Sequence, residues 1–294
     1  MDYTNQVFTT RLVLSTSTII RIILCQFHQI RNSNAGGALY VYDSNYEFNQ
    51  RYNEFFNNSG ADGGSVYVDV KKAYSYGICI VNSKGSRGSG IFQICSSNNQ
   101  MNSSTTAYCS SNFYATWDLC YGIATANHVN TSYCSATVRE SASHYGGGPI
   151  CSTTFFTCCG NIGPGIFGPF SGHSGVMPHS FCNFIYNKAG SIGVIAVWSG
   201  EHQLIKCVFL LNEGDTSSSG SGSYIGMGSL LYVDCSFDAS PTGYYISTSN
   251  CIINGNPTTY NPLISVSGIC NINILTSRSS NKAKMIYFLY ALFL

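Results

Sequence analysis

The chain has 294 residues, of which 14 are Lys or Arg and 13 are Asp or Glu, so its formal net charge is +1. Charged residues make up only 9% of the chain, against about 25% in an ordinary soluble domain. This balance excludes a basic surface for nucleic acid and a polybasic membrane patch. A hydrophobic content of 44% excludes a disordered chain.

The N-terminal segment, residues 1–24, is predicted to be a lead or a cap. As a secretion signal it is poor, because Asp2 stands where a basic residue is expected. Its apolar stretch, residues 12–23, is interrupted by Ser, Thr and Arg. We therefore expect that a secretion signal is either missing from this copy or does not exist.

Four markers share a period of about 26 residues between residues 25 and 275. Gly-Gly or Ser-Gly precedes an apolar residue at Leu39, Val66 and Ile91, in steps of 27 and 25. The later copies of Cys-x-Phe recur in steps of 25 and 28, and Tyr-Cys recurs after 25. The copies of Cys-x-Phe begin at Cys25, Cys182, Cys207 and Cys235, and those of the fourth marker, Phe-x-x-Asn, at Phe55, Phe184 and Phe209.

This repeat predicts an all-β fold. Short runs of Val, Ile, Tyr and Phe bounded by Gly, Ser and Asn are typical of strands and turns, and no long helical periodicity is visible. Two or three strands per period suit one rung of a parallel β-helix, predicted here for residues 25–275. An antiparallel sandwich or propeller is disfavoured, because only Asp62-Gly63 and Asn254-Gly255 resemble hairpin turns.

Each repeated residue type has a predicted place in such a coil. Cys and Phe of Cys-x-Phe share one side of a strand and should stack inward. The Asn of Phe-x-x-Asn should adopt left-handed backbone geometry and form a ladder. Gly-Gly should supply positive φ at a corner. The markers are weakest between residues 95 and 175.

The 14 cysteines do not have the spacing of a zinc site. We interpret most of them as small buried apolar residues. Disulfides among some of them, or a metal, are the alternatives. Sequons at Asn57, Asn102 and Asn130 are compatible with secretion.

The C-terminal segment, residues 276–294, is predicted to be a tail with a short apolar end. Its last ten residues, 285–294, are apolar and follow Lys282 and Lys284. As a helix they would span about 15 Å, half of a hydrocarbon core. The tail is therefore a truncated anchor, an interfacial or packed end, or an out-of-place segment.

The sequence predicts no catalytic, cofactor-binding or metal site, and no cofactor. The closest acidic pairs are Glu213 with Asp215 and Asp234 with Asp238, which we interpret as solvated turns. His173, within residues 171–175, resembles a polygalacturonase motif but has no carboxylate partners at fitting offsets. The other histidines are scattered, and no nucleophile elbow or phosphate loop occurs. They are His28, His128, His144, His179 and His202.

The motifs resemble a known family. Gly-Gly-Ala-(Ile/Leu/Val) and Phe-x-x-Asn are the paired motifs of the chlamydial polymorphic outer-membrane proteins, and similar repeats occur in Cys- and Tyr-rich surface proteins of trichomonads and other protists. This chain has Gly-Gly-Ala-Leu at 36–39, degenerate copies at Gly63 and Gly193, and the fusion Cys-x-Phe-x-x-Asn at 182–187 and 207–212. The resemblance covers residues 25–240. It implies a right-handed coil, since the repeat alone permits either hand.

The resemblance also implies a function. We expect a non-enzymatic repeat protein of the cell surface or the secreted medium, adhesion-like or antigenic, whose partners are host-surface glycans or proteins and not nucleic acid. Membrane association would depend on a missing or truncated anchor, and the chain is then a truncated family copy. The alternative is a β-helix polysaccharide lyase or hydrolase, because many such enzymes use this fold.

Overall fold

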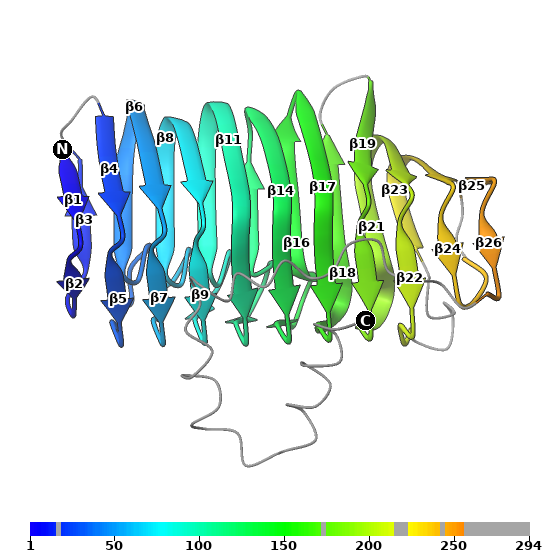
Figure 1. The fold of residues 1–294 in the computed structure, drawn as a ribbon, viewed down its shortest axis with the longest axis horizontal. Coiled ribbons are helices and arrows are strands. Elements are labelled where there is room, and N and C mark those ends of the chain that lie inside the picture. The colour runs from blue at the N-terminus through cyan, green and yellow to red at the C-terminus, as the bar shows by residue number, and fades with distance from the viewer. Residues whose placement is uncertain (16–18, 172–174, 215–222, 242–244, 256–294) are drawn as a thin grey trace, which may run out of the picture.

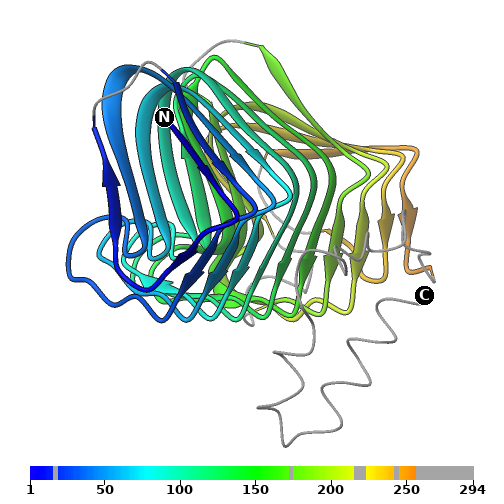
Figure 2. The ribbon, with the colours of Figure 1, turned by 60° about the vertical axis from the view of Figure 1, so that its left-hand side comes forward.

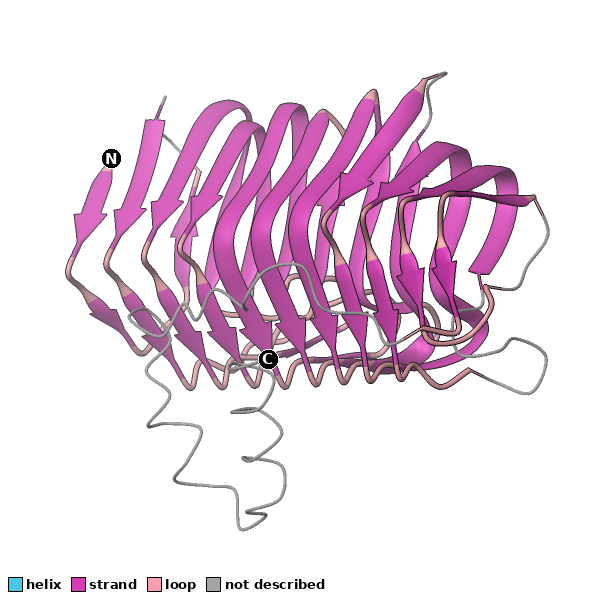
Figure 3. Cartoon of the chain, turned by 45° about the vertical axis from the view of Figure 1, so that its right-hand side comes forward, coloured by secondary structure: helices cyan, strands magenta, loops and turns pink. Residues whose placement is uncertain are grey.

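A computed structural model describes residues 1–15, 19–171, 175–214, 223–241 and 245–255. Within these ranges every regular element is a β-strand and none is a helix (Figure 3). The strands pair in parallel with strands one repeat away, so the chain winds into an elongated stack of turns (Figure 1). The predicted parallel β-helix is therefore confirmed.

Each complete turn has three faces that meet at corners, as Figure 2 shows. Face 1 alone is formed by β3 (Leu12–Leu14), β13 (Trp117–Cys120) and β16 (Glu140–Gly148). Face 2 alone is formed by β1 (Asp2–Thr4), β4 (Ile19–Ile23), β19 (Val176–Ser180) and β25 (Ile246–Ser249). Face 3 alone is formed by β2 (Val7–Phe8), β5 (Gln26–His28), β7 (Glu54–Phe56), β9 (Cys79–Val81), β20 (Asn183–Ile185), β22 (Val208–Leu210), β24 (Ser236–Phe237) and β26 (Ile252–Ile253).

Longer strands pass around the corners. Faces 1 and 2 share β6 (Leu39–Arg51), β8 (Val66–Tyr76) and β23 (Ser223–Val233). Faces 2 and 3 share β14 (Ile123–Ser132) and β17 (Ile150–Cys159), and β11 (Ile91–Ala107) crosses all three faces. A short fourth ladder contains β10 (Lys84–Gly85), β12 (Ser110–Ser111), β15 (Ser135–Ala136) and the first residues of β18 (Ile162–Ser171) and β21 (Lys188–Ile205). The strands β18 and β21 then continue onto face 1, and β21 continues further onto face 2.

The predicted period is that of the interior turns. On face 3, successive strands from β5 to β24 are in register at steps of 25 to 28 residues. The first step, from Val7 to Gln26, is 19 residues, and the last, from Ser236 to Ile252, is 16. The segment 1–24, predicted as a lead or cap, is thus itself a shorter first turn, and its apolar stretch supplies β3 and β4. The tail 276–294 lies outside the described residues.

Two corners of each turn are made by single residues in the left-handed region. At corner 1, between faces 2 and 3, φ lies between 48° and 65°, and at corner 2, after face 3, between 51° and 64°. One such residue bends the chain while the residues on both sides stay extended. Corner 1 is formed by Asn5, Leu24, Tyr52, Gly77, Ser103, His128, Phe155, Phe181, Lys206, Asp234 and Asn250, and corner 2 by Gln29, Asn57, Asn82, Tyr108, Tyr133, Gly160, Tyr186, Leu211 and Asn254.

The Cys-x-Phe motif occupies the start of face 3. Its Cys follows the corner 1 residue and is buried, and its Phe lies two residues on, also inside. The phenylalanine rings stack along the axis, with centroids 4.7 Å apart for Phe27 and Phe55 and 4.9 Å for Phe184 and Phe209. The inward ladder predicted for Cys and Phe is therefore confirmed.

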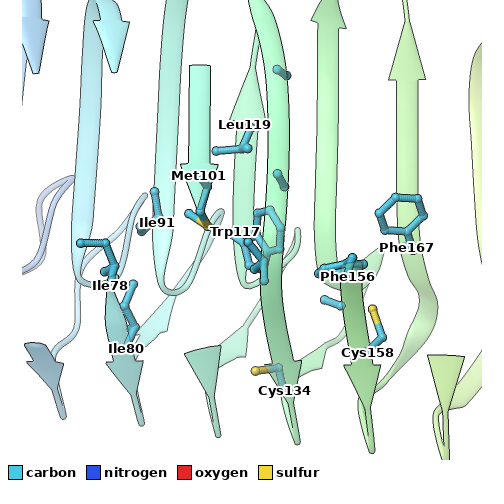
Figure 4. Close-up of a cluster of buried hydrophobic side chains, with 14 of the residues drawn as sticks. Ile78, Ile80, Ile91, Met101, Trp117, Leu119, Cys134, Phe156, Cys158 and Phe167 are labelled. Carbon is cyan, nitrogen blue, oxygen red and sulfur yellow. The ribbon is translucent and has the colours of Figure 1, made fainter. Parts of the chain in front are cut away.

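The middle turns fill the same space differently, which explains why the markers fade there. The positions equivalent to the stacked rings are Ile80, Thr106, Thr131 and Cys158. Larger side chains from other positions replace the missing rings: Trp117 meets Phe156 edge-on at 5.2 Å, and Phe156 lies 5.4 Å from the Phe167 ring (Figure 4).

The Asn of Phe-x-x-Asn forms a ladder, but the prediction that it adopts left-handed geometry is wrong. The left-handed residue is the one before it, for example Tyr186 before Asn187. Asn187 is buried, its Oδ1 accepts the backbone N–H of Asn161 at 3.0 Å, and its Nδ2 donates to the Cys158 carbonyl at 3.0 Å. The amide thus satisfies backbone groups that the corner leaves unpaired.

Glycine at the entry to face 1 does have the predicted positive φ, 64° at Gly36 and 61° at Gly63. The following glycine is needed for a second reason. A Cβ on Gly37 would lie 2.2 Å from the carbonyl oxygen of Gly64 one turn away, so only glycine allows this approach.

We predict that Phe209→Ala lowers the free energy of unfolding by about 3–5 kcal/mol, because the fully buried ring stacks on both neighbouring turns. The matched control is Leu211→Ala, two residues away and 51% exposed, which should change it by less than about 0.5 kcal/mol. Urea unfolding of the two variants measures both values, and equal effects would contradict the ladder.

We predict that Asn187→Ala costs about 3 kcal/mol, since it leaves a buried N–H and a buried carbonyl without partners. Asn127→Ala removes one amide contact, to Asn102 at 3.1 Å, from a partly exposed strand position and should cost less than about 1 kcal/mol. Thermal unfolding of both variants tests the difference, and similar losses would show that the buried ladder has no special role.

Candidate interaction surface

Corner 2 carries a row of tyrosines, of which two are exposed and Tyr133 is partly exposed. Tyr108 and Tyr133 stack with centroids 5.3 Å apart and planes 10° apart. At the next turn the equivalent residue is Gly160, where a Cβ would lie 2.7 Å from Tyr133 Cε1, so the missing side chain leaves room for the ring. Tyr186 follows, 47% exposed, and Tyr108 is 40% exposed. We call Tyr108, Tyr133 and Tyr186 the tyrosine ridge.

The phenols of Tyr108 and Tyr133 keep their protons near neutral pH. Partial burial raises the pKa of Tyr133 to about 12 and also raises the pKa of Tyr108. A tyrosine in this form offers an apolar ring and a neutral hydroxyl that donates or accepts a hydrogen bond.

Corner 1 carries a second aromatic row across face 3. His128 stacks on Phe155 at 4.7 Å, Phe155 on Phe181 at 5.1 Å, and Lys206 Nζ lies 5.8 Å from the Phe181 ring centroid. Between the two rows, the outward positions of face 3 are polar in these turns. Thr105 and Asn130 are partly exposed, whereas Thr157 and Asn183 are buried, with Asn183 Nδ2 donating to Thr157 Oγ1 at 3.3 Å.

Face 1 carries aromatic side chains on its outer side near the N-terminus. Tyr40 stacks on Tyr67 at 5.1 Å, and Tyr67 meets Phe92 at 5.5 Å. The guanidinium of Arg11 lies 4.9 Å from the Tyr40 ring and that of Arg87 5.0 Å from Phe92. Each arginine is therefore held flat against the coil by a cation–π contact.

A further outer cluster joins residues from separate turns. Trp198 Nε1 donates to Glu140 Oε1 at 2.5 Å, and the Arg139 guanidinium lies 4.3 Å from the Trp198 ring. The contact spans 58 residues in sequence and passes over Gly168, where a Cβ would lie 2.5 Å from Glu140 Cδ. Glu140 is fully buried, so its carboxylate holds the indole in place and is closed to solvent.

Of the two acidic pairs found in the sequence, only Asp234 with Asp238 is fully described, and its members lie apart. Glu213 Oε2 pairs with Lys188 Nζ at 3.5 Å, and both side chains are exposed, while Asp215 lies outside the described residues. Asp234 sits at corner 1 and Asp238 follows β24, so the width of face 3 separates them. The Asp238 carboxylate accepts the Leu211 backbone N–H, which is a turn role.

The histidines are mostly apart. His28 packs edge-on to Phe56, His128 belongs to the corner 1 row, and His173 lies outside the described residues. His144 is in register with Asp118, although only its backbone is described. His179 and His202 are the exception, because their imidazoles make direct contact inside the coil.

The cysteines are mainly buried, as the sequence predicted. In the part of the chain that the structure describes, twelve are free and ten of these are buried, while Cys79 is disulfide-bonded. Burial raises the pKa of Cys159 to about 11, and burial together with Asp118 raises the pKa of Cys120. Cys120 donates to Asp118 Oδ1 at 3.2 Å, so it is a thiol rather than an activated thiolate.

In the part of the chain that the structure describes, no three His, Cys, Asp or Glu side chains gather into a group that could hold a metal ion. No described helix is long and apolar enough to cross a bilayer.

Sequence reasoning missed polar contacts that join different ladders, among them His179 with His202 and Glu140 with Trp198. His179 is in register with Leu204, not with His202, so their contact is diagonal and 23 residues apart. Glu140 and Trp198 are two turns apart. Neither contact joins residues at the same position of successive repeats, so comparison of the repeats finds neither pair. A polar residue at a position expected to face inward would have been a signal of such a contact.

Comparison with known proteins gave no relatives: no family model, no curated protein and no solved structure matched the chain.

We predict that iodoacetamide labels Cys251 and Cys120 first in the native protein, since they are the two partly exposed free thiols. The ten buried thiols should react only after unfolding. Peptide mass spectrometry at a series of reaction times measures the order. Rapid labelling of a buried thiol in the native protein would instead identify a reactive nucleophile and favour an enzyme.

Proposed function

We propose that this chain is a non-enzymatic, adhesion-like β-helix protein of the cell surface or the secreted medium. The observation that carries the proposal is the tyrosine ridge, a row of exposed and partly exposed rings on a corner whose backbone is repeated and hydrogen-bonded on both sides. Tyrosine is enriched among the residues that dominate binding energy at interfaces, because one ring combines apolar area with a hydroxyl.

The outer surface supports the same reading. The ridge and the corner 1 row flank the partly exposed polar side chains of Thr105 and Asn130, an arrangement suited to the apolar faces and hydroxyls of a glycan or to a protein surface. The sequon residues Asn57, Asn102 and Asn130 are partly exposed. Each accepts one side-chain hydrogen bond through Oδ1, which is compatible with passage through the secretory route.

The resemblance to polymorphic outer-membrane proteins and trichomonad surface proteins supplies the choice of adhesion over other binding roles. Under this proposal the partners are host-surface glycans or proteins, and the protein belongs to the Cys-rich repeat proteins of a surface.

We predict that the folded chain binds host-cell surfaces or a glycan array, and that replacing the ridge by Tyr108→Ser, Tyr133→Ser and Tyr186→Ser weakens binding about tenfold or more. The control replaces Tyr42, Tyr76 and Tyr121, which are exposed elsewhere on the coil, and should bind like the original chain. Binding by neither chain would refute the proposal. Release of unsaturated or reducing sugar products from the array glycans would favour the lyase or hydrolase alternative.

A further inference from the structure

A chain of hydrogen bonds runs through the core across three turns. Thr153 Oγ1 lies 2.9 Å from His179 Nδ1, and His179 Nε2 lies 3.0 Å from His202 Nδ1. His202 Nε2 lies 3.0 Å from the carbonyl oxygen of Ser199. Both imidazoles are buried, with 0% and 1% exposure, and their rings stack at 5.3 Å.

The partners fix the direction of every hydrogen bond. The Ser199 carbonyl only accepts, so His202 Nε2 must carry a hydrogen, and in the neutral ring its Nδ1 then accepts. His179 Nε2 must therefore donate to His202, which leaves His179 Nδ1 to accept from the Thr153 hydroxyl. Both histidines are thus neutral Nε2–H tautomers, and no ring nitrogen is spare.

Protonation destabilises this arrangement. A second hydrogen on His202 would occupy its Nδ1, which already faces the Nε2–H of His179, so two donors would meet at 3.0 Å. A second hydrogen on His179 could be accepted by the Thr153 hydroxyl, which can turn, so there the cost is the buried charge itself. Protonation of either ring would bury a positive charge. Burial lowers the pKa of His202 to about 4, and burial together with His202 lowers the pKa of His179 well below its ordinary value.

Among the residues that the structure describes, no carboxylate makes a hydrogen bond or ion pair with the two imidazoles. From β18, Phe167 meets His179 edge-on at 5.3 Å, while Met177 and Leu230 are in register with His202. The titratable groups in contact are thiols: Cys182 Sγ lies 3.5 Å from Thr153 Oγ1, and Cys207 Sγ lies 3.5 Å from the His179 carbonyl. The adjacent acid, Glu201, is exposed on the other side of β21.

We propose that the hydrogen-bonded chain from Thr153 through His179 and His202 to Ser199 is an acid-sensitive latch, which closes the turns of β17, β19 and β21 at neutral pH and releases them in an acidic environment. The sign follows from linkage. In the opened turns the imidazoles bind protons with an ordinary pKa of about 6.5, but in the closed turns His202 binds one only near pH 4. The stability of the closed turns is therefore lost as the pH falls between these two values.

The same molecule contains an internal control. A second buried chain uses amides and a hydroxyl: Gln50 Nε2 donates to Ser75 Oγ at 2.8 Å, and Gln93 Nε2 donates to Asn99 Oδ1 at 2.5 Å. Ser75 Oγ joins the two by donating to Gln93 Oε1 at 3.2 Å. None of these groups titrates in this range, so the turns of β6, β8 and β11 should not open with acid.

Hydrogen exchange of the full chain, read by mass spectrometry at about pH 7.5 and about pH 5, tests the latch. After correction for intrinsic exchange rates, protection in β19 and the face 2 part of β21 should fall at least about tenfold, because each pH unit below the ordinary pKa favours the protonated open form tenfold per imidazole. Protection in β8 and β11 should stay within about threefold. Unchanged protection in β19 and β21, or an equal fall in both regions, would overturn the proposal.

Variants separate the latch from other effects of acid. The double variant His179→Gln and His202→Gln replaces imidazoles by amides like those of the control chain and should abolish the pH dependence of protection in β21. His128→Gln removes an imidazole from the outer corner and should leave that dependence unchanged. If the folded double variant keeps the dependence, the latch is refuted; if it does not fold, the comparison of the two regions in the original chain still decides.

Discussion

Parallel stacking in register is the constraint on which the rest of this structure depends. Each residue of an interior turn lies beside the equivalent residues one repeat earlier and one repeat later. Each side chain must therefore pack against the side chains at the same position of the two adjacent turns. Like charges would repel along such a ladder, and the chain accordingly has few of them. Rings gain contact on both faces, and phenylalanine stacks inside and tyrosine outside over runs of neighbouring turns.

The same constraint explains the corners. A non-glycine residue in the left-handed region is strained by roughly 1–3 kcal/mol, yet the coil places Tyr, Phe, Leu and Lys there turn after turn. These conformations persist because the backbone on both sides is already fixed by hydrogen bonds to adjacent turns. The inward residue that follows, such as Asn187, then supplies the partners that the bend removes. Strain at the corner also directs the large side chain outward, which creates the ridges.

The sequence predicted those features that repeat at one period. The parallel coil, the inward Cys-x-Phe ladder and the glycine corner at Gly36 all follow from residues that recur every 25 to 28 positions. The assignment of left-handed geometry to the Asn of Phe-x-x-Asn failed, because the motif does not show which of two adjacent polar or aromatic residues bends. Phe156 and Trp117 escaped prediction because they fill the core from positions outside the repeated motif.

The contacts that the sequence did not predict are the ones that distinguish particular turns. A ladder of identical groups repeats the same interaction in every turn, so it gives no turn a property of its own. A diagonal contact such as His179 with His202 ties different ladders together and makes neighbouring turns respond as a unit. The two buried polar chains perform this role with different chemistry. The amide chain between Gln50 and Asn99 has no titratable group, whereas the imidazole chain depends on both rings being neutral. The coil is therefore uniform in architecture but not in its response to protons, and that difference lies in the turns of β19 and β21, next to the end of the tyrosine ridge at Tyr186.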